Sequence, residues 1–513
     1  MRSRVKGHAP SRRRTPLLIG LVLAAIAILA SAVALLADSP QAENLAPTDS
    51  RYPNVDLANT RQATGPLRAA TVSALEVAWR IPMAAQHGLE GSGAMPVVAD
   101  GVAYTQDLES NVQAIELSSG EILWEKTYGS KTRGPNGVVV ANGLVYGATK
   151  TNAFALDPQT GEEVWSTRLA PNDLERIAMA PGYHRGLVYL STTPAGHRGG
   201  EVGVLWALDG KTGKKVWDFA TVPRSLWGDR SINFGGGVSY PPAFDDKGSM
   251  YFGTDNPGPI PGTNAHPWGS SRPGPNLYTT SVVKLNAETG KLQWYYQMTP
   301  HALCNWDVGS TILAQGGGRD LVIAGGLSGI VVALDRETGK LVWRKAVGVH
   351  NGHNNDGLYA MRAEYSKLKM PMTVYPGALG GVFGPPSTDG STVFVPVVNY
   401  ATKLFSQTTA GQGGSLTGEL VALSIASGAI RWKHNFSSPP VGATTVDNDL
   451  VFTTTLDGTM YAFNGDDGRT AWKTRLPAGS NAGVTISGST LLAPAASVET
   501  EQEPKLSAYR LAN

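Results

Sequence analysis

One eleven-residue pattern, A-L-D-x-x-T-G-x-x-x-W, recurs along the chain and limits what the chain can fold into. Each copy predicts an alternating strand, a tight turn closed by glycine, and a second strand that ends in tryptophan. The acidic or hydroxyl residue bonds the local backbone, glycine supplies positive φ, and tryptophan packs against the adjoining sheet. Seven copies occupy residues 114–124, 155–165, 207–217, 284–294, 333–343, 422–432 and 462–472.

A shorter strand with its own turn precedes most copies, as in GVAYT (101–105) and SMYFGT (249–254). One unit is therefore a four-stranded antiparallel sheet, which cannot bury both faces alone and must stack on its neighbours. An eighth unit is split between the chain ends, with ALEVAWRI (74–81) as its outer part and KLSAYRL (505–511) as the missing strand. The sequence predicts an all-β, eight-bladed β-propeller over residues 71–513.

Composition agrees with this fold class and excludes others. The chain has 61 Gly, 33 Pro, 16% charged residues and a single Cys, which argues against a disordered chain, a coiled coil and a disulfide scaffold. From residue 38 onward 37 basic residues face 41 acidic ones, so the body lacks the basic footprint of a nucleic-acid-binding protein. No C-x-x-C-H motif is present, so we expect no attached haem.

The N-terminus carries a membrane signal. Residues 17–37 form an uncharged apolar run, long enough to span a bilayer as a helix, and the basic tail 1–16 precedes it. The charge asymmetry predicts a single-pass cell-membrane anchor with the body outside the cytoplasm. The alternative is a cleaved signal peptide, because A-x-A sites occur at 30–32 and 32–34, and the protein would then be secreted. Residues 38–70 are interpreted as a tether.

The tryptophan-docking repeat resembles the eight-bladed propellers of quinoprotein dehydrogenases, which bind pyrroloquinoline quinone (PQQ) beside a calcium ion on the ring axis. The resemblance covers nearly all of residues 70–513. Scaffolding propellers of bacterial outer-membrane assembly and some kinase sensor domains carry the same repeat. The fold therefore cannot decide the function, and the site must.

Three segments outside the repeat resemble the calcium and base motifs of that family. GGEVGVLWALD (199–209) is similar to the stretch whose glutamate ligates calcium, which implies Glu201. YFGTDNPGP (251–259) is similar to G-T-G-N-P-x-P, whose asparagine is a second ligand, which implies Asn256. YYQMTPHALCNWDVGST (295–311) is similar to the segment whose W-D aspartate is the general base, which implies Asp307 as base and third calcium ligand.

Three further positions resemble cofactor contacts. GLEGSGAMPVV (88–98) is similar to the first-blade segment that supplies a glutamate, here Glu90, and Thr149 matches a threonine that bonds a cofactor carboxylate. Tyr240, after Gly-Gly-Gly, stands where the family has a stacking tryptophan. The calcium and base positions have structural alternatives: Glu201 as a loop carboxylate facing water, Asn256 as a turn residue, and Asp307 as the cap of a turn after Trp306.

The resemblance implies a dehydrogenase that oxidises a small alcohol with PQQ and calcium. Calcium prefers carboxylate and amide oxygens, and the ion polarises the quinone carbonyl while a base takes the alcohol proton. Electrons would pass to a separate acceptor. The competing hypothesis is a non-catalytic propeller that binds proteins or cell-envelope components.

Several departures from the family favour that competing hypothesis. The paired cysteines that cover one quinone face should fall near Ser130 and Lys131, and the cation that bonds the quinone oxygens should stand where the chain has Leu327. Asn136 replaces an expected arginine, and Phe383 stands in the loop where the family has an asparagine. The missing cation matters most, because it would stabilise the charge of the reduced quinone.

Two other groups invite a functional interpretation that we consider weaker than the structural one. Cys304 lies beside the predicted base, but a buried and inert thiol is expected. His350, His353 and Asp356 lie within VGVHNGHNNDGL, where a solvated loop is expected rather than a metal centre.

Overall fold

The computed structural model describes residues 49–84, 95–131, 137–171, 174–196, 199–223, 225, 227–496 and 502–512. The chain divides into two units, Met1–Asn44 and Leu45–Asn513, and every described residue belongs to the second. The predicted basic tail and anchor, residues 1–37, lie outside the described residues. Among the residues that are described, no helix is long and apolar enough to cross a membrane.

Eight sheets of four or five strands, antiparallel apart from one parallel strand pair, confirm the prediction of eight four-stranded units, and a further described sheet has two strands. We number the sheets as blades 1 to 8 in chain order. The first four blades are β3 (Val97–Ala99), β4 (Val102–Gln106), β5 (Val112–Glu116) and β6 (Ile122–Lys126); β7 (Val139–Ala141), β8 (Leu144–Ala148), β9 (Asn152–Leu156) and β10 (Glu163–Arg168); β11 (Glu175–Ile177), β12 (Gly182–His184), β13 (Leu187–Pro194), β14 (Val204–Asp209) and β15 (Lys215–Ala220); and β17 (Ala243–Phe244), β18 (Ser249–Gly253), β20 (Ser281–Asn286) and β21 (Leu292–Gln297).

The second four blades follow the same plan, and two of them gain a short extra strand. They are β22 (Val308–Gly316), β23 (Arg319–Gly326), β24 (Ile330–Asp335) and β25 (Leu341–Ala346); β26 (Met372–Val374), β27 (Ser387–Thr388), β28 (Thr392–Leu404), β29 (Ala410–Ser424) and β30 (Ile430–Phe436); β31 (Thr445–Asp447), β32 (Leu450–Thr454), β33 (Thr459–Asn464) and β34 (Thr470–Arg475) with β1 (Gln62–Ala63); and β35 (Thr485–Ser487), β36 (Thr490–Ala495), β37 (Lys505–Leu511) and β2 (Leu75–Pro82).

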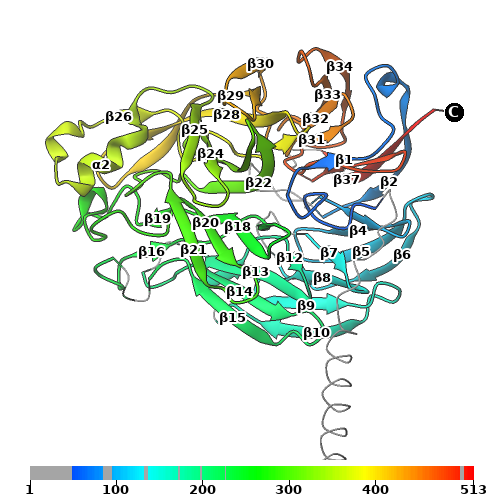
Figure 1. The fold of residues 1–513 in the computed structure, drawn as a ribbon, viewed down its shortest axis with the longest axis horizontal. Coiled ribbons are helices and arrows are strands. Elements are labelled where there is room, and N and C mark those ends of the chain that lie inside the picture. Colours follow the sequence, from blue (N-terminus) through cyan, green and yellow to red (C-terminus); the bar gives the residue numbers. More distant parts are fainter. Residues whose placement is uncertain are drawn as a thin grey trace, which may run out of the picture. The chain divides into compact units, whose positions relative to one another are not determined.

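The two ends of the propeller meet in blade 8. Strand β2 pairs antiparallel with β37, from Leu75 opposite Leu511 to Pro82 opposite Lys505. Figure 1 shows the blue strand β2 beside the red strand β37. The split eighth unit predicted from the sequence is therefore confirmed, and the pairing joins residues more than four hundred positions apart.

The repeated tryptophans connect neighbouring blades. Trp165 of blade 2 donates its indole Nε1–H to the carbonyl oxygen of Gly210 in blade 3 at 2.9 Å. Its ring fills the space above Gly213, where an added Cβ would lie 2.5 Å from the ring. The same indole-to-carbonyl bond to the next blade is made by Trp79, Trp124, Trp217, Trp294, Trp343 and Trp432.

Residues 50–63, which we call the inner segment, lie against the inner strands of six blades. Hydrogen bonds join it in turn to Val98, Val140, Phe244, Leu313, Thr388 and Val446. Strand β1, at its end, pairs in parallel with β31. One short segment reaches the inner strands of six blades only where those strands converge, so the inner segment lies at the centre of the propeller. The tether predicted for residues 38–70 is therefore corrected: from residue 49 onward the chain packs against the blades.

The long connections of blades 4 to 6 carry the short helical elements. These are η2 (Pro267–Gly269), η3 (His353–Asn355), α2 (Asp356–Met361) and η4 (Tyr365–Lys367), while η1 (Val72–Ala74) precedes β2. Trp268, Leu303, Trp306, Leu327 and Leu368 belong to one apolar cluster drawn from these connections. We call this cluster the apolar cap. It joins loops that are far apart in the sequence.

The contact between glycine and tryptophan can be tested by two matched glycine substitutions. Gly213 and Gly143 have nearly the same positive φ, +68° and +72°, but an added Cβ meets Trp165 at Gly213 and nothing within 4 Å at Gly143. We expect Gly213→Ala to lower the free energy of unfolding by about 1–3 kcal/mol more than Gly143→Ala, because only the first overpacks the interface between blades. Urea unfolding followed by tryptophan fluorescence measures the difference, and equal losses would contradict the docking role.

Candidate functional site

A short glycine-rich strand brings two of the predicted site segments together. Strand β16 (Phe234–Gly235) pairs with β19 (Pro257–Gly258). The amide N–H of Gly235 donates to the carbonyl oxygen of Glu201 at 3.1 Å, and that of Gly236 donates to the carbonyl oxygen of Asn256 at 3.1 Å. The predicted ligands Glu201 and Asn256 therefore lie on the two sides of one strand, although 55 positions separate them in the sequence.

Asp307 joins the same site through a direct hydrogen bond. The backbone N–H of Asn256 donates to Asp307 Oδ1 at 2.6 Å. Asp307 immediately precedes β22, and Gly253 at the end of β18 allows the close approach, because a side chain there would overlap the backbone of Val308 and Gly309. The structure thus brings all three predicted calcium-ligand segments to one place.

The predicted calcium ligands combine carboxylate oxygens, of Glu201 and Asp307, with an amide oxygen, of Asn256. The side-chain NH₂ of Asn256 donates to the carbonyl oxygen of Pro257 at 2.9 Å, so its amide oxygen is the atom available to a cation. Within the described ranges, no three His, Cys, Asp or Glu side chains are grouped closely enough to hold a metal ion by themselves. A calcium site here would therefore require the Asn256 oxygen and donors from the bound ligand.

Asp255 is a second carboxylate at this site, and the sequence analysis did not select it. It accepts hydrogen bonds from the Ser239 hydroxyl at 3.0 and 3.1 Å and from the Thr193 hydroxyl at 3.5 Å. It occupies the position of the second glycine in the family's G-T-G-N-P pattern. This aspartate in place of glycine is the sequence signal that could have identified Asp255, because it adds a charge next to the predicted ligand Asn256.

Burial makes both aspartates unusually weak acids. Desolvation raises the pKa of Asp255 to about 6, partly offset by the Ser239 hydrogen bonds. The pKa of Asp307 is raised well above its ordinary value by desolvation and by the negative charge of Asp255. Neither carboxylate forms an ion pair with any described residue. Two such carboxylates favour either protons or a bound cation.

Tyr240 lies beside this pair. Its hydroxyl donates to the carbonyl oxygen of Phe383 at 3.0 Å, and its ring approaches Gly309. Burial and the negative charges of Asp255 and Asp307 raise the pKa of its phenol. Tyr240, Asn256 and Asp307 are each half-buried, so they retain surface that a ligand can reach.

The departures from the family pattern lie at the same site. The backbone N–H of Leu327 donates to the carbonyl oxygen of Asp307 at 2.9 Å, which joins the backbone of Leu327 to that of the predicted base. Leu327 packs in the apolar cap with Trp268 and Trp306, and Phe383 packs against the same cluster. At positions 327 and 383, where the family pattern has polar side chains, this chain has the apolar side chains of Leu327 and Phe383.

Two predicted cofactor contacts remain predictions. The hydroxyl of Thr149 accepts hydrogen bonds from the backbone N–H of Asn152 at 3.0 Å and of Thr151 at 3.3 Å, so it stabilises the turn between β8 and β9. Glu90 lies outside the described residues, as does Asn136.

Arg61 in the inner segment is a second residue that sequence reasoning missed. Its side chain is buried, and desolvation lowers its pKa to about 9 while the charges of Tyr240 and Asp56 raise it. It lies in the segment predicted as a tether, and no local pattern in the sequence marks it as central.

The structure agrees with the expected buried thiol of Cys304 but corrects the solvated loop expected around His350, because this segment forms η3 and α2 and buries Asp356. Cys304 is buried in the apolar cap, and burial raises the pKa of its thiol to about 12, so the reactive thiolate is scarce. Both ring nitrogens of His350 face protein oxygens, on Asn354 and Val347, each at 2.9 Å. His353 pairs with Asp356 at 2.7 Å within the helical turn.

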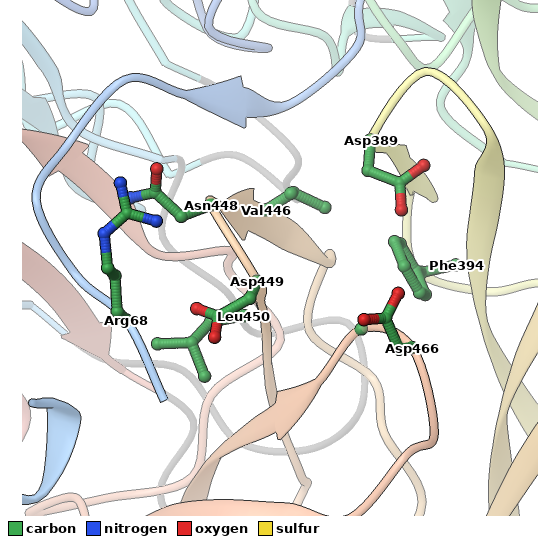
Figure 2. Close-up of a pocket in the computed structure, with 9 residues that line it drawn as sticks. Arg68, Asp389, Phe394, Val446, Asn448, Asp449, Leu450 and Asp466 are labelled. Carbon is green, nitrogen blue, oxygen red and sulfur yellow. The ribbon is translucent and has the colours of Figure 1, made fainter. Parts of the chain in front are cut away.

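A separate surface cleft of about 280 Å³ lies between blades 6 and 7. Figure 2 shows Arg68, Asn448 and Asp449 on one side, and Asp389 and Asp466 around Phe394 on the other. None of the predicted site residues lines it. The predicted site residues that the structure describes therefore lie elsewhere in the propeller.

The sequence matches two related protein families. Residues 187–346 match the β-propeller domain of glucose, ethanol and alcohol dehydrogenases, and residues 108–240 and 363–513 match the outer membrane protein assembly factor BamB. The chain therefore belongs to the PQQ β-propeller family related to quinoprotein alcohol dehydrogenases.

The chain is similar to individual quinoprotein alcohol dehydrogenases. The chain is 30% identical over 498 residues to the quinohemoprotein alcohol dehydrogenase of Comamonas testosteroni, covering 82% of this chain and 68% of that protein. It is 25% identical over 554 residues to the quinoprotein alcohol dehydrogenase PedH of Pseudomonas putida, covering 90% and 88%.

Solved structures show the same fold. The quinohemoprotein alcohol dehydrogenase of Comamonas testosteroni matches with a TM-score of 0.79 at 23% identity, over 91% of this chain and 81% of that one. A europium-containing methanol dehydrogenase matches with a TM-score of 0.76 at 19% identity, over 91% and 98%.

The buried charge of Asp255 predicts a pH-dependent stability. Its folded pKa lies above its unfolded value, so the folded protein holds the proton more tightly and stability falls as pH rises from about 4 through 6. We therefore expect Asp255→Asn to raise the unfolding temperature at pH 7 and to change it little at pH 4, in buffer containing a calcium chelator. Exposed Asp246→Asn is the control, and an equal effect of Asp255→Asn at both pH values would refute the electrostatic explanation.

Proposed function

We propose that this chain is a quinoprotein dehydrogenase that oxidises an alcohol with PQQ and calcium. The observation that carries the proposal is the meeting of Glu201, Asn256 and Asp307 around the strand Phe234–Gly236. Family membership alone would not suffice, because the same repeat serves scaffold proteins.

The residues present fit a divalent cation. Asp255 and Asp307 are neighbouring carboxylates, and the positive charge of Arg176 only partly offsets the burial of Asp255. Glu201 is buried on the other side of β16. A cation would favour the ionised forms that burial disfavours. Glu201, the Asn256 amide oxygen and Asp307 would hold the calcium ion, with Asp255 adding negative charge from behind Asn256.

The chain's own groups would then position and deprotonate the alcohol. When bound, PQQ accepts the two electrons of the oxidation and calcium acts as a Lewis acid. Asp307 is the base, because it is half-buried and reachable, and a nearby cation would keep it ionised. The apolar cap, with Trp268, Leu327 and Phe383, would exclude water and contact the carbon chain of the alcohol.

The remaining features of the proposal come from the sequence. The single cysteine permits no C-x-x-C-H haem motif, so electrons would leave to a separate acceptor. The apolar segment 17–37 would hold the propeller outside the cytoplasm at the membrane, or release it if cleaved.

A non-catalytic scaffold is the second candidate function. Leu327 stands where the family has a cation at the quinone, and Ser130 and Lys131 stand where it has the cysteine pair. Much of the chain also matches an outer-membrane assembly factor. Under this hypothesis the propeller would bind proteins or cell-envelope components through its faces.

Titration calorimetry of PQQ into the full-length chain in detergent separates the two functions. We expect PQQ to bind only when calcium is present, because the site carboxylates repel the anionic cofactor without it. Glu201→Gln and Asp307→Asn should each weaken binding by at least about 10- to 100-fold, the range seen even for outer-shell groups of metal sites.

Asp246→Asn, on an exposed turn, is the matched control and should bind as the unmodified protein does. Absence of PQQ binding with and without calcium would remove the dehydrogenase proposal. The scaffold hypothesis would then be pursued on the propeller faces.

A further inference from the structure

Arg61 is a buried cation with no negatively charged hydrogen-bond partner among the described residues. Its side chain is 4% exposed, and its two terminal nitrogens contact neutral acceptors, Met95 Sδ and Asn54 Oδ1. Its Nε–H has no hydrogen-bond partner, and Arg61 forms no ion pair within the part of the chain that the structure describes. Burial of an uncompensated charge is costly, so this arrangement indicates a missing anion.

Asp56, the only acidic residue of the inner segment, does not provide the missing anion. Asp56 influences the pKa of Arg61, but its carboxylate accepts hydrogen bonds from the backbone N–H and hydroxyl of Thr60. Arg272 provides a contrast. It is equally buried, and its guanidinium is satisfied by Asn276 Oδ1 and by the carbonyl oxygens of Ala302 at 2.6 Å and Pro259 at 3.2 Å.

The guanidinium lies where several blades begin. Met95 precedes β3, and Gly483 precedes β35, where an added Cβ would lie 2.9 Å from Met95 Sδ and 3.3 Å from Arg61 Nη1. Arg61 also acts electrostatically on Tyr240, on which Asp255 and Asp307 act too. The inner segment therefore brings a positive charge to the neighbourhood of the candidate site.

We propose that Arg61 binds a carboxylate group of the ligand held at the candidate site. The identification of that ligand as PQQ, a quinone with three carboxylates, rests on the proposed function. Positions 136 and 327, where the family has cations, hold Asn and Leu here. Arg61 would supply positive charge from the inner segment, and a guanidinium suits a carboxylate because its N–H groups match the two oxygens.

The test varies the charge of the ligand and the charge of residue 61 in one set of binding measurements. Calorimetry on the full-length chain with calcium would compare PQQ with its trimethyl ester, which lacks the carboxylate charges, in the unmodified protein and in Arg61→Met. We expect Arg61→Met to weaken PQQ binding roughly 10- to 100-fold, as for a charge-assisted hydrogen bond, and to leave ester binding unchanged. Arg61→Lys should recover part of the loss. Equal PQQ affinity in the unmodified protein and Arg61→Met would overturn the inference.

Stability without PQQ gives a readout independent of cofactor binding and activity. Because the charge is uncompensated, ligand-free Arg61→Met should unfold at the same temperature as the unmodified protein or a higher one, whereas Arg272→Met should unfold at a lower one. Benzene-1,3,5-tricarboxylate, compared with chloride at equal ionic strength, should raise the unfolding temperature of the unmodified protein and of the exposed-turn control Asp246→Asn but not of Arg61→Met.

These results distinguish the two proposals. If the unmodified protein does not bind PQQ but the tricarboxylate stabilises it through Arg61, the proposed dehydrogenase fails and the carboxylate site stands. If ligand-free Arg61→Met loses stability as Arg272→Met does, Arg61 is a structural residue and the inference fails. If Asp246→Asn abolishes the tricarboxylate response as Arg61→Met does, the response is not specific to Arg61, and the inference also fails.

Discussion

The contact between a tryptophan on one blade and the glycine turn of the next holds this propeller together. Every blade exposes a flat sheet face that it cannot bury alone, and each indole both covers that face and donates a hydrogen bond across the boundary. Trp472 of blade 7 is the exception, because blade 8 is assembled from both chain ends and has no such turn; it packs instead against Tyr509. Ring closure and tryptophan docking thus act together, because Trp79 of the closing blade also donates to a carbonyl of blade 1.

The centre of the propeller is occupied by the chain itself. The inner segment bonds the inner strands of six blades and carries Arg61, while Asn59 bonds the carbonyl oxygens of Pro241 and Thr311. These contacts tie the chain that precedes the first repeat to the blades that carry Tyr240 and Asp307. A feature near the N-terminus therefore contributes to the electrostatics of a site whose other residues come from the middle of the chain.

The candidate site combines charges that the protein does not neutralise internally. The charge of Arg176 only partly offsets the burial of Asp255 beside Asp307, and buried Arg61 has no anionic hydrogen-bond partner among the described residues. In an isolated protein both arrangements are unfavourable, and a ligand that brings a cation and carboxylates would relieve both. The apolar cap over the same region, including Leu327 and Phe383, sets this chain apart from the family pattern and would make its substrate contacts more apolar.

The sequence by itself determined the repeat, the number of blades, the closure of the last blade and the segments that carry Glu201, Asn256 and Asp307. These follow from local periodicity and short motifs, which can be recognised without distant contacts. Only the tertiary structure decided that residues 50–63 fill the centre, that Asp255 lies against Asp307, and that Arg61 is buried. These depend on contacts between segments far apart in the chain, and no local pattern encodes them. Burial, which sets the pKa of each charged group, is likewise a property of the packed fold.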